Sequence, residues 1–121
     1  MEDQRLAVHR TIVVVDVEGF GDQRRTNAHQ VAVRAGLYRV MREAFGRAGI
    51  SWDDCGVEDR GDGVFVLIPA EVPKGLLAES VPPALVTALR GHNGAHPRPE
   101  RFQAVTSESV ARHRARSMFA W

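Results

Sequence analysis

The chain has 121 residues, of which 44% are hydrophobic and 26% charged, and its formal net charge is +1. These values fit one globular domain and imply neither an intrinsically disordered chain nor a general polyanion-binding surface. The single cysteine, Cys55, excludes an internal disulfide, and no apolar run approaches the roughly twenty residues that span a bilayer, so we expect a cytoplasmic protein that does not bind a membrane.

Residues 8–17 are predicted to form a strand buried on both faces, because they are β-branched and continuously apolar at their centre. The strand ends with Asp16, and a glycine-bearing loop, Gly19-Phe20-Gly21, follows it. An ionised carboxylate at the end of a buried strand is costly unless a cation offsets it. Backbone N–H groups at the entry to a helix suit phosphate oxygens. This segment therefore predicts a metal and phosphate site.

A helix is predicted to begin at Thr26 or Asn27 and to end at Gly49, because apolar residues recur between them at spacings of three and four. After a turn at residues 51–54, the segments 56–60 and 64–68 are typical of a hairpin about Gly61-Asp62-Gly63. The hairpin places Asp62 at the start of a second apolar strand.

Beyond residue 69 the pattern predicts a short helix at 74–81, a second helix beginning near Pro83, a loop at 91–99 and a strand at 101–105. A basic helix is expected at 107–118. Residues 98–121 hold five arginines against two glutamates, a net charge of +3 that leaves −2 for residues 1–97. We expect a solvated basic tail, or one whose Phe119 and Trp121 dock on the core. Nucleic acid is not an expected partner, because no aromatic ladder accompanies the arginines.

The expected order of strand, helix, two strands, helix and strand is typical of an α+β fold of the ferredoxin-like or polymerase-palm-like kind, with an antiparallel sheet and helices on one face. The first and third strands are then central neighbours. Asp16 and Asp62 therefore lie on the same rim, where they could share Mg²⁺ or Mn²⁺ ions. Two such ions about 4 Å apart would stabilise a nucleophilic oxygen and a triphosphate leaving group.

Over roughly residues 8–93, the chain resembles the class III nucleotidyl cyclases. Asp16-Val-Glu-Gly-Phe20 resembles their first metal-binding strand, and Asp62 between two glycines resembles their second metal aspartate in its hairpin. The similarity is greatest to small cyclase-homology proteins of actinomycete type. The resemblance implies an incomplete class III cyclase fold in which Asp16, Asp62 and the Val17 carbonyl bind the metal.

The resemblance also implies roles for two further parts of the chain. Gly19, Phe20 and Gly21 correspond to the triphosphate loop of the cyclases. Glu58 falls where guanylyl cyclases carry a base-reading glutamate and adenylyl cyclases a lysine, which favours GTP over ATP.

After about residue 99 the chain departs from the family pattern. Family members continue with an Arg-x-Gly-x-His-x-Gly strand and an Asn-x-x-x-Arg helix that contacts the α-phosphate, and neither occurs here. We therefore divide the chain into a partial cyclase-like domain, 1–97, and a divergent basic tail, 98–121, with a truncated or frame-altered ending. Loss of such an arginine costs orders of magnitude in rate, so we assign no catalytic residue and expect nucleotide binding without cyclase activity.

Family sites are shared between subunits, so a homodimer, or a heterodimer with a full-length cyclase-like chain, could supply the missing residues. The alternative function is a non-catalytic signalling module that binds a nucleotide or another protein. Asp16-Val-Glu18 also resembles proofreading exonucleases and haloacid-dehalogenase-type phosphatases. The first class needs a later aspartate, which residues 75–121 lack, and the second needs an aspartate at position 18 and a longer chain.

Each site residue also has a purely structural interpretation. Asp16 alone could be a strand-end turn residue, the loop glycines could serve geometry only, and Glu58 could be a solvated hairpin charge. Cys55 is expected to pack rather than to act as a nucleophile. The five histidines form no HExxH motif and are expected at the surface, with residues 92–96 in a loop rather than a zinc site.

Overall fold

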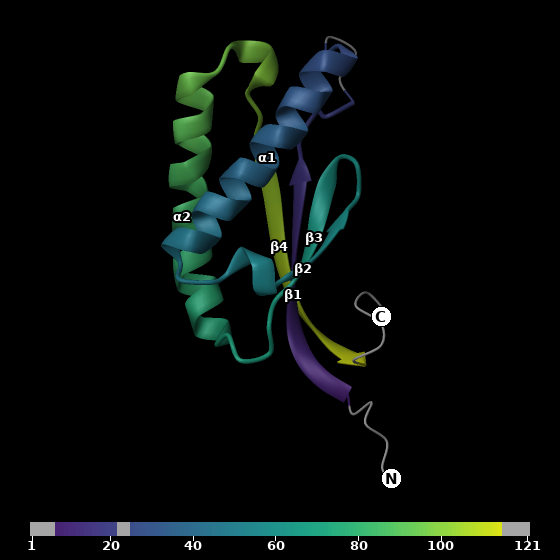
Figure 1. The fold of residues 1–121 in the computed structure, drawn as a ribbon, viewed down its shortest axis with the longest axis vertical. Coiled ribbons are helices and arrows are strands. Elements are labelled where there is room, and N and C mark those ends of the chain that lie inside the picture. The colour runs from purple at the N-terminus through teal and green to yellow at the C-terminus, as the bar shows by residue number, and fades with distance from the viewer. Residues whose placement is uncertain (1–6, 22–24, 115–121) are drawn as a thin grey trace.

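The computed structural model describes residues 7–21 and 25–114, which form a four-stranded antiparallel sheet and two long helices (Figure 1). The strand order is β2-β3-β1-β4, so β1 and β3 are central neighbours as the sequence predicts, and the α+β ferredoxin-like fold is confirmed. In chain order the elements are β1 (Ala7–Val17), α1 (Asn27–Arg47), the 3₁₀ turn η1 (Trp52–Asp54), β2 (Gly56–Asp59), β3 (Gly63–Leu67), α2 (Lys74–Ala95), the 3₁₀ turn η2 (Arg98–Glu100) and β4 (Ala104–Arg114).

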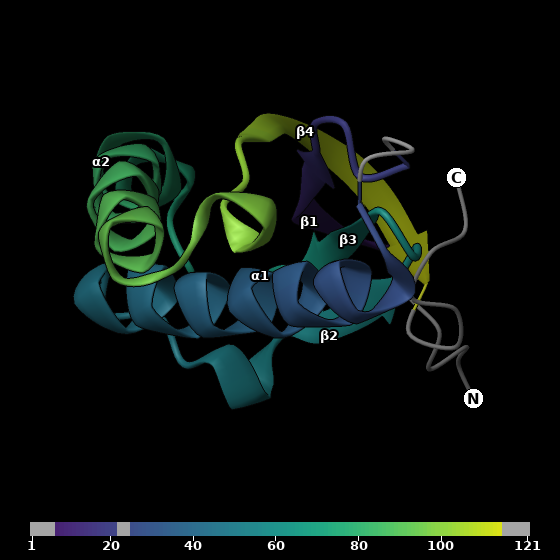
Figure 2. The same cartoon turned by 90° about the horizontal axis from the view of Figure 1, so that it is seen from above.

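Both helices cover one face of the sheet (Figure 2). Side chains alternate along β1, so every second residue faces the helices and packs in the main core. The core residues of the two central strands and the two helices include Val13, Val15, Val17, Val64, Val66, Leu37, Met41, Phe45, Leu77 and Leu85. Ile12 and Leu67 form a small separate cluster with Val14. The even-numbered side chains of β1, including that of Asp16, therefore lie on the sheet face away from the helices.

Helix α1 has caps at both ends that its sequence predicts. Thr26 is the N-cap, and its hydroxyl accepts a hydrogen bond from the His29 N–H at 3.1 Å. The His29 side chain accepts in return from the Thr26 N–H at 3.1 Å, which completes a capping box. Beyond the helix, Gly49 has a φ of 78°, a left-handed conformation that glycine adopts without strain.

The prediction of two short helices after residue 73 is wrong, because α2 runs unbroken from Lys74 to Ala95 through Pro82 and Pro83. Both prolines are exposed, so their rings lie on the solvent side of the helix. The buried side of α2 carries residues at spacings of three and four that pack on the core, namely Leu77, Val81, Leu85, Ala88 and His92. This continuous apolar stripe outweighs the local cost of the prolines.

Residues 92–96 are also not the predicted loop, and His92 is not at the surface. His92 is only 7% exposed, lies in the last turns of α2 and stacks on His96 with ring centroids 4.0 Å apart. Its Nε2 is 3.0 Å from the Glu100 carbonyl oxygen. Gly36 of α1 lies directly against this imidazole, and a Cβ at position 36 would be 2.4 Å from His92 Cε1. The two helices therefore approach each other closely where Gly36 faces His92.

The prediction of a basic helix at 107–118 is wrong for its described part, because residues 104–114 form β4. β4 pairs with β1 over eleven residues, from Ala104 opposite Val17 to Arg114 opposite Ala7. Pairing satisfies backbone groups along an edge of β1 that would otherwise be open, and this tertiary gain overrides local helix preference. Residues 115–121 lie outside the described residues, so the predicted docking of Phe119 and Trp121 stays a prediction, as does the domain division at residue 97.

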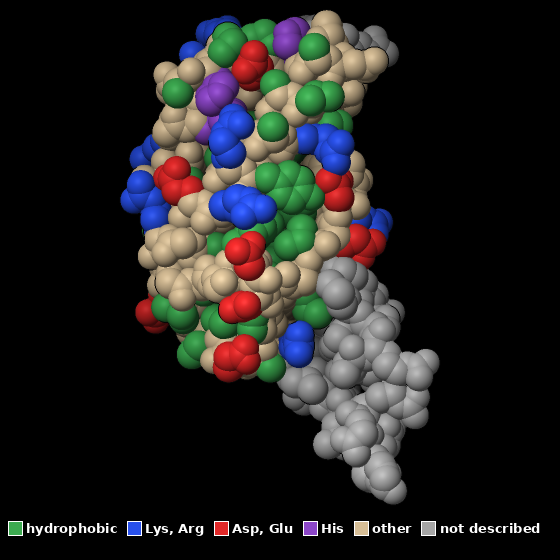
Figure 3. Space-filling view, viewed as in Figure 1, with side chains coloured by type: hydrophobic (Ala, Val, Ile, Leu, Met, Phe, Trp, Pro, Cys, Tyr) green, Lys and Arg blue, Asp and Glu red, His purple; other side chains and the backbone are tan. Residues whose placement is uncertain are grey.

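On the face seen in Figure 3, basic and acidic side chains are interspersed rather than gathered by sign. Such a mixed surface does not create the single-sign potential that attracts polyanions. Within the described residues, neither helix is long and apolar enough to cross a membrane.

We predict that Gly36→Ala lowers the free energy of unfolding by about 1–3 kcal/mol, because the added methyl group would overlap the His92 ring. Gly46→Ala is the matched control on the same helix, since a Cβ there meets nothing within 4 Å. That control should stabilise the protein by about 0.5–1 kcal/mol. Urea denaturation measures both changes, and equal effects of the two substitutions would show that the helices do not meet at Gly36.

Candidate metal and phosphate site

The register between β1 and β3 brings the two candidate metal aspartates to one rim of the sheet. Asp16 lies opposite Gly63, the residue that follows Asp62. The Val17 N–H donates to the Asp62 carbonyl oxygen at 2.8 Å, which extends the ladder into the hairpin turn. The backbone positions of both aspartates are thus fixed by hydrogen bonds between neighbouring strands.

Two glycines allow the hairpin to approach the end of β1. A Cβ at position 63 would be 2.2 Å from the Val15 carbonyl oxygen and 2.7 Å from Asp16 Oδ1. Gly61 has a φ of 86°, which an L-residue rarely adopts. Asp62 therefore sits between two positions at which any side chain would be strained or would clash.

Asp16 and Asp62 are both exposed, and within the described part of the chain neither carboxylate forms an ion pair with an arginine or lysine. Oxygen ligands of this kind suit Mg²⁺ and Mn²⁺. Among the described residues no group of three or more His, Cys, Asp or Glu side chains is placed to share a metal ion. A metal here would depend on these two carboxylates, a backbone carbonyl such as that of Val17, and other oxygen ligands.

The turn after β1 is held through its carbonyl groups. Gly19 has a φ of 64°, and its carbonyl accepts from Arg25 Nη1 at 3.0 Å. The Phe20 carbonyl accepts from Gln30 Nε2 of α1 at 3.1 Å. A trans peptide points its N–H opposite to its C=O, so the N–H groups of Phe20 and Gly21 point away from these side chains. That orientation leaves both N–H groups directed away from Arg25 and Gln30.

Glu58 lies on the same face of the sheet as Asp16. Residues directly opposite in an antiparallel pair share a face, and Glu58 is opposite Phe65, which is opposite Val14. The Glu58 side chain is 38% exposed and lies 3.5 Å from Arg60 Nη1, whose guanidinium also stacks on Phe65 at 4.7 Å. An exposed ion pair of this length is weak, so Glu58 remains available to another hydrogen-bond donor.

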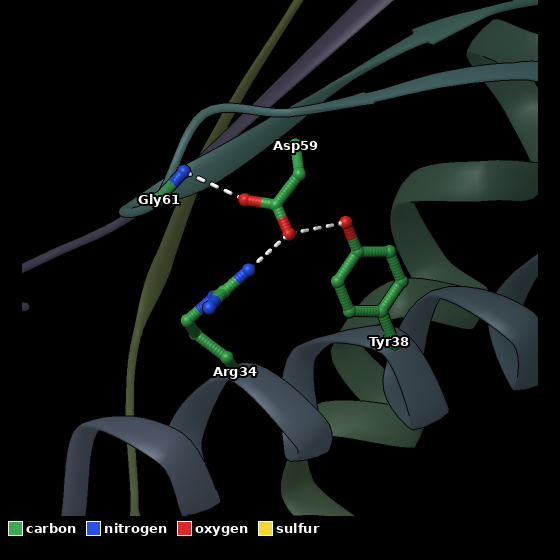
Figure 4. A network of polar contacts seen from close by, with 4 residues as sticks. All are labelled: Arg34, Tyr38, Asp59 and Gly61. Carbon is green, nitrogen blue, oxygen red and sulfur yellow. Dashed lines mark hydrogen bonds and ion pairs between the residues drawn. The ribbon is translucent and has the colours of Figure 1, made fainter.

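A polar network that the sequence does not predict anchors the hairpin to α1 (Figure 4). Asp59 accepts hydrogen bonds from Arg34, from the Tyr38 hydroxyl at 2.8 Å and from the Gly61 N–H at 2.7 Å. Arg34 and Tyr38 are four residues apart and so share a helix face, but nothing local in the sequence indicates that Asp59 would meet them. The network holds the turn that carries Asp62.

The network also fixes the charge of its members. Burial alone would raise the pKa of Asp59, but the hydrogen bonds from Gly61, Arg34 and Tyr38 outweigh burial and lower it. Burial, together with the hydrogen bond to this carboxylate, raises the pKa of Tyr38 to about 12. At neutral pH an ionised carboxylate therefore faces a neutral phenol and a guanidinium.

The lone cysteine is a packing residue, as its surroundings show. Burial raises the pKa of the Cys55 thiol to about 11, and its S–H donates to the Ser51 carbonyl at 3.4 Å. A thiol with so high a pKa is protonated at neutral pH and is a poor nucleophile.

The fold is similar to that of the guanylyl cyclase Cya2 in its crystal structure, with a TM-score of 0.61 and 21% identical residues. The match covers 89% of this chain and 56% of that chain, so this chain spans little more than half the length of the cyclase. No protein-family model matches the sequence, and no curated protein matches it. The comparison establishes a cyclase-like fold, as the resemblance of the sequence implies.

Proposed function

We propose that this chain binds a divalent metal ion and a nucleoside triphosphate, with GTP preferred, and does not cyclise the nucleotide by itself. One observation carries the proposal. In a cyclase-like fold, the β1–β3 register places Asp16 opposite the residue after Asp62, and neither carboxylate has an ion-pair partner in the described residues. Two uncompensated carboxylates at one rim repel each other unless a cation lies between them.

The chemical roles follow from the residue types. Asp16, Asp62 and the Val17 carbonyl would hold Mg²⁺ or Mn²⁺, which when bound would offset charge on phosphate oxygens. The N–H groups of the Gly19, Phe20 and Gly21 turn would donate to the triphosphate. Glu58, on the same sheet face as Asp16, would accept from N1 and N2 of guanine.

Turnover is not proposed, because the sequence lacks the Asn-x-x-x-Arg segment by which family members contact the α-phosphate. A second copy, or a full-length cyclase-like chain, would have to supply such residues. This absence also supports the second candidate function, a non-catalytic regulatory module in the cytoplasm that binds a nucleotide or a protein. A relationship to cyclase-homology proteins of actinomycete type belongs to the same proposal.

We predict that Asp16→Asn and Asp62→Asn each weaken Mn²⁺ binding by about tenfold or more, because each removes a charged oxygen ligand. Calorimetric titration with MnCl₂ measures this effect. Asp53→Asn is the control, since Asp53 is exposed on η1 and, among the residues that the structure describes, pairs only with Arg42, at 3.8 Å. Mn²⁺ binding that is unchanged in both site variants, or that Asp53→Asn reduces equally, would contradict the proposed metal site.

A second prediction concerns the base. GTP should bind roughly tenfold more tightly than ATP in the presence of Mn²⁺, because guanine offers adjacent donors at N1 and N2 to the Glu58 carboxylate, whereas adenine N1 is an acceptor. Glu58→Lys should abolish or invert this ratio, whereas Glu43→Lys, an equal charge change on the exposed side of α1, should leave it unchanged. Equal affinities for both nucleotides in the unmodified protein would return Glu58 to the role of a solvated hairpin charge.

The third prediction is that the isolated chain forms no cyclic nucleotide from any nucleoside triphosphate with Mn²⁺. Metal ions alone leave the charge at the transferring phosphorus only partly offset. Chromatography of overnight reactions is the measurement. Steady formation of cGMP, cAMP, cCMP or cUMP that Asp62→Ala abolishes would contradict this prediction and identify the chain as a complete cyclase.

A further inference from the structure

We propose that Arg25 and Arg101 form a binding groove for the terminal phosphates of the nucleotide. The groove lies between the turn after β1 and the segment that leads into β4, and it has a volume of about 490 Å³. Glu18, Gly19, Arg25, Arg101 and Gln103 line it. This assignment rests on the proposed function and adds to it a pair of cationic residues that neither the loop nor the hairpin supplies.

Arg25 lines the groove and is held by backbone acceptors from both of its walls. Its Nη1 donates to the Gly19 carbonyl at 3.0 Å, and its Nη2 donates to the Arg101 carbonyl at 2.6 Å. A guanidinium has five N–H donors, so these two bonds leave others for a ligand. Carbonyl oxygens orient the group but do not neutralise its charge.

Arg101 brings a second positive charge to the same groove. Its Nε donates to the His96 carbonyl at 2.8 Å, which holds the stem of the side chain and leaves the two terminal nitrogens outside the bonds that the described residues form. Within the described residues neither Arg25 nor Arg101 has a carboxylate within 4.0 Å, although Glu18 lines the groove. Two cationic side chains that line one groove without an ion-pair partner favour an anion in it.

The groove adjoins the proposed metal and phosphate site through Glu18 and Gly19. Glu18 follows Asp16 by two residues, a separation of roughly 7 Å along an extended chain. The Glu18 N–H donates to the Gln103 carbonyl at 2.9 Å and so joins the two walls. Gly19 belongs both to the groove and to the predicted triphosphate turn. A phosphate chain held near Asp16 would therefore reach the two guanidinium groups, whose planar forks match phosphate oxygens.

Calorimetric titration with inorganic tripolyphosphate in EDTA tests the groove without any metal ion. Arg25→Gln and Arg101→Gln should each weaken binding roughly tenfold, the effect of one charge-assisted hydrogen bond, and Arg101→Lys should retain part of the affinity. Arg90→Gln, at an exposed position of α2, is the charge-matched control and should bind as the unmodified protein does. Thermal unfolding verifies that each variant is folded. If Arg25→Gln does not fold, the result for Arg101→Gln decides the test.

The outcomes separate the groove from the metal site. Because EDTA removes divalent ions from this titration, a failure of Mn²⁺ to bind in the separate metal titration would overturn the proposed function while leaving the arginine dependence in place. GTP in EDTA should show the same arginine dependence, and binding of tripolyphosphate without GTP would overturn the assignment to a nucleotide. No binding of tripolyphosphate, or equal losses in the arginine variants and the Arg90→Gln control, would overturn the groove itself.

Discussion

The close approach of the two central strands at Gly63 is the constraint on which the rest of the structure depends. A side chain at position 63 would overlap the Val15 carbonyl oxygen, so only glycine lets the β2–β3 hairpin extend the ladder to the end of β1. The hydrogen bonds of that ladder fix the position of Asp62 along the strand direction relative to Asp16. β1 also pairs along its other edge with β4. It therefore fixes the position of the hairpin relative to the segment that carries Arg101.

Acidic residues near this rim have two different environments. The Asp59 carboxylate stabilises the fold, since it accepts hydrogen bonds from Arg34, Tyr38 and the Gly61 N–H. Asp16 and Asp62 receive no such compensation from the described residues, although Asp62 is only three residues further along the chain. This contrast supports the proposal that the rim at Asp16 and Asp62 binds a cation from outside the chain.

The sequence predicts those elements whose conformation is determined by residues close together in the chain. The buried β1, the capped α1 and the glycine hairpin each follow from a short pattern, and together they determine the order of the strands. Prediction from the sequence fails at α2 and β4, because contacts between residues far apart in the chain determine their conformation. Pro82 and Pro83 are read as a break until the apolar stripe of α2 is seen to pack on the core. Residues 107–114 have little strand pattern of their own before β1 pairs with them.

The candidate site divides in the same way. Asp16 and Asp62 are found from strand ends and turns, whereas Arg25 joins residues 19 and 101, which are remote in sequence. Two helical residues, Arg34 and Tyr38, contact a hairpin residue more than twenty positions away. No spacing rule links such residues, so the network and the groove become visible only when the chain is folded.

Tyr38 is the only tyrosine in the chain, and its hydroxyl is hydrogen-bonded to a carboxylate of the hairpin. Because burial and that carboxylate raise the pKa of Tyr38 to about 12, phenolate absorbance in this protein depends on a single group whose ionisation opposes the docking of the hairpin on α1. The chain thus carries its own optical reporter. Ultraviolet titration can follow the attachment of the turn around Asp62 with no label and no second chromophore of the same kind.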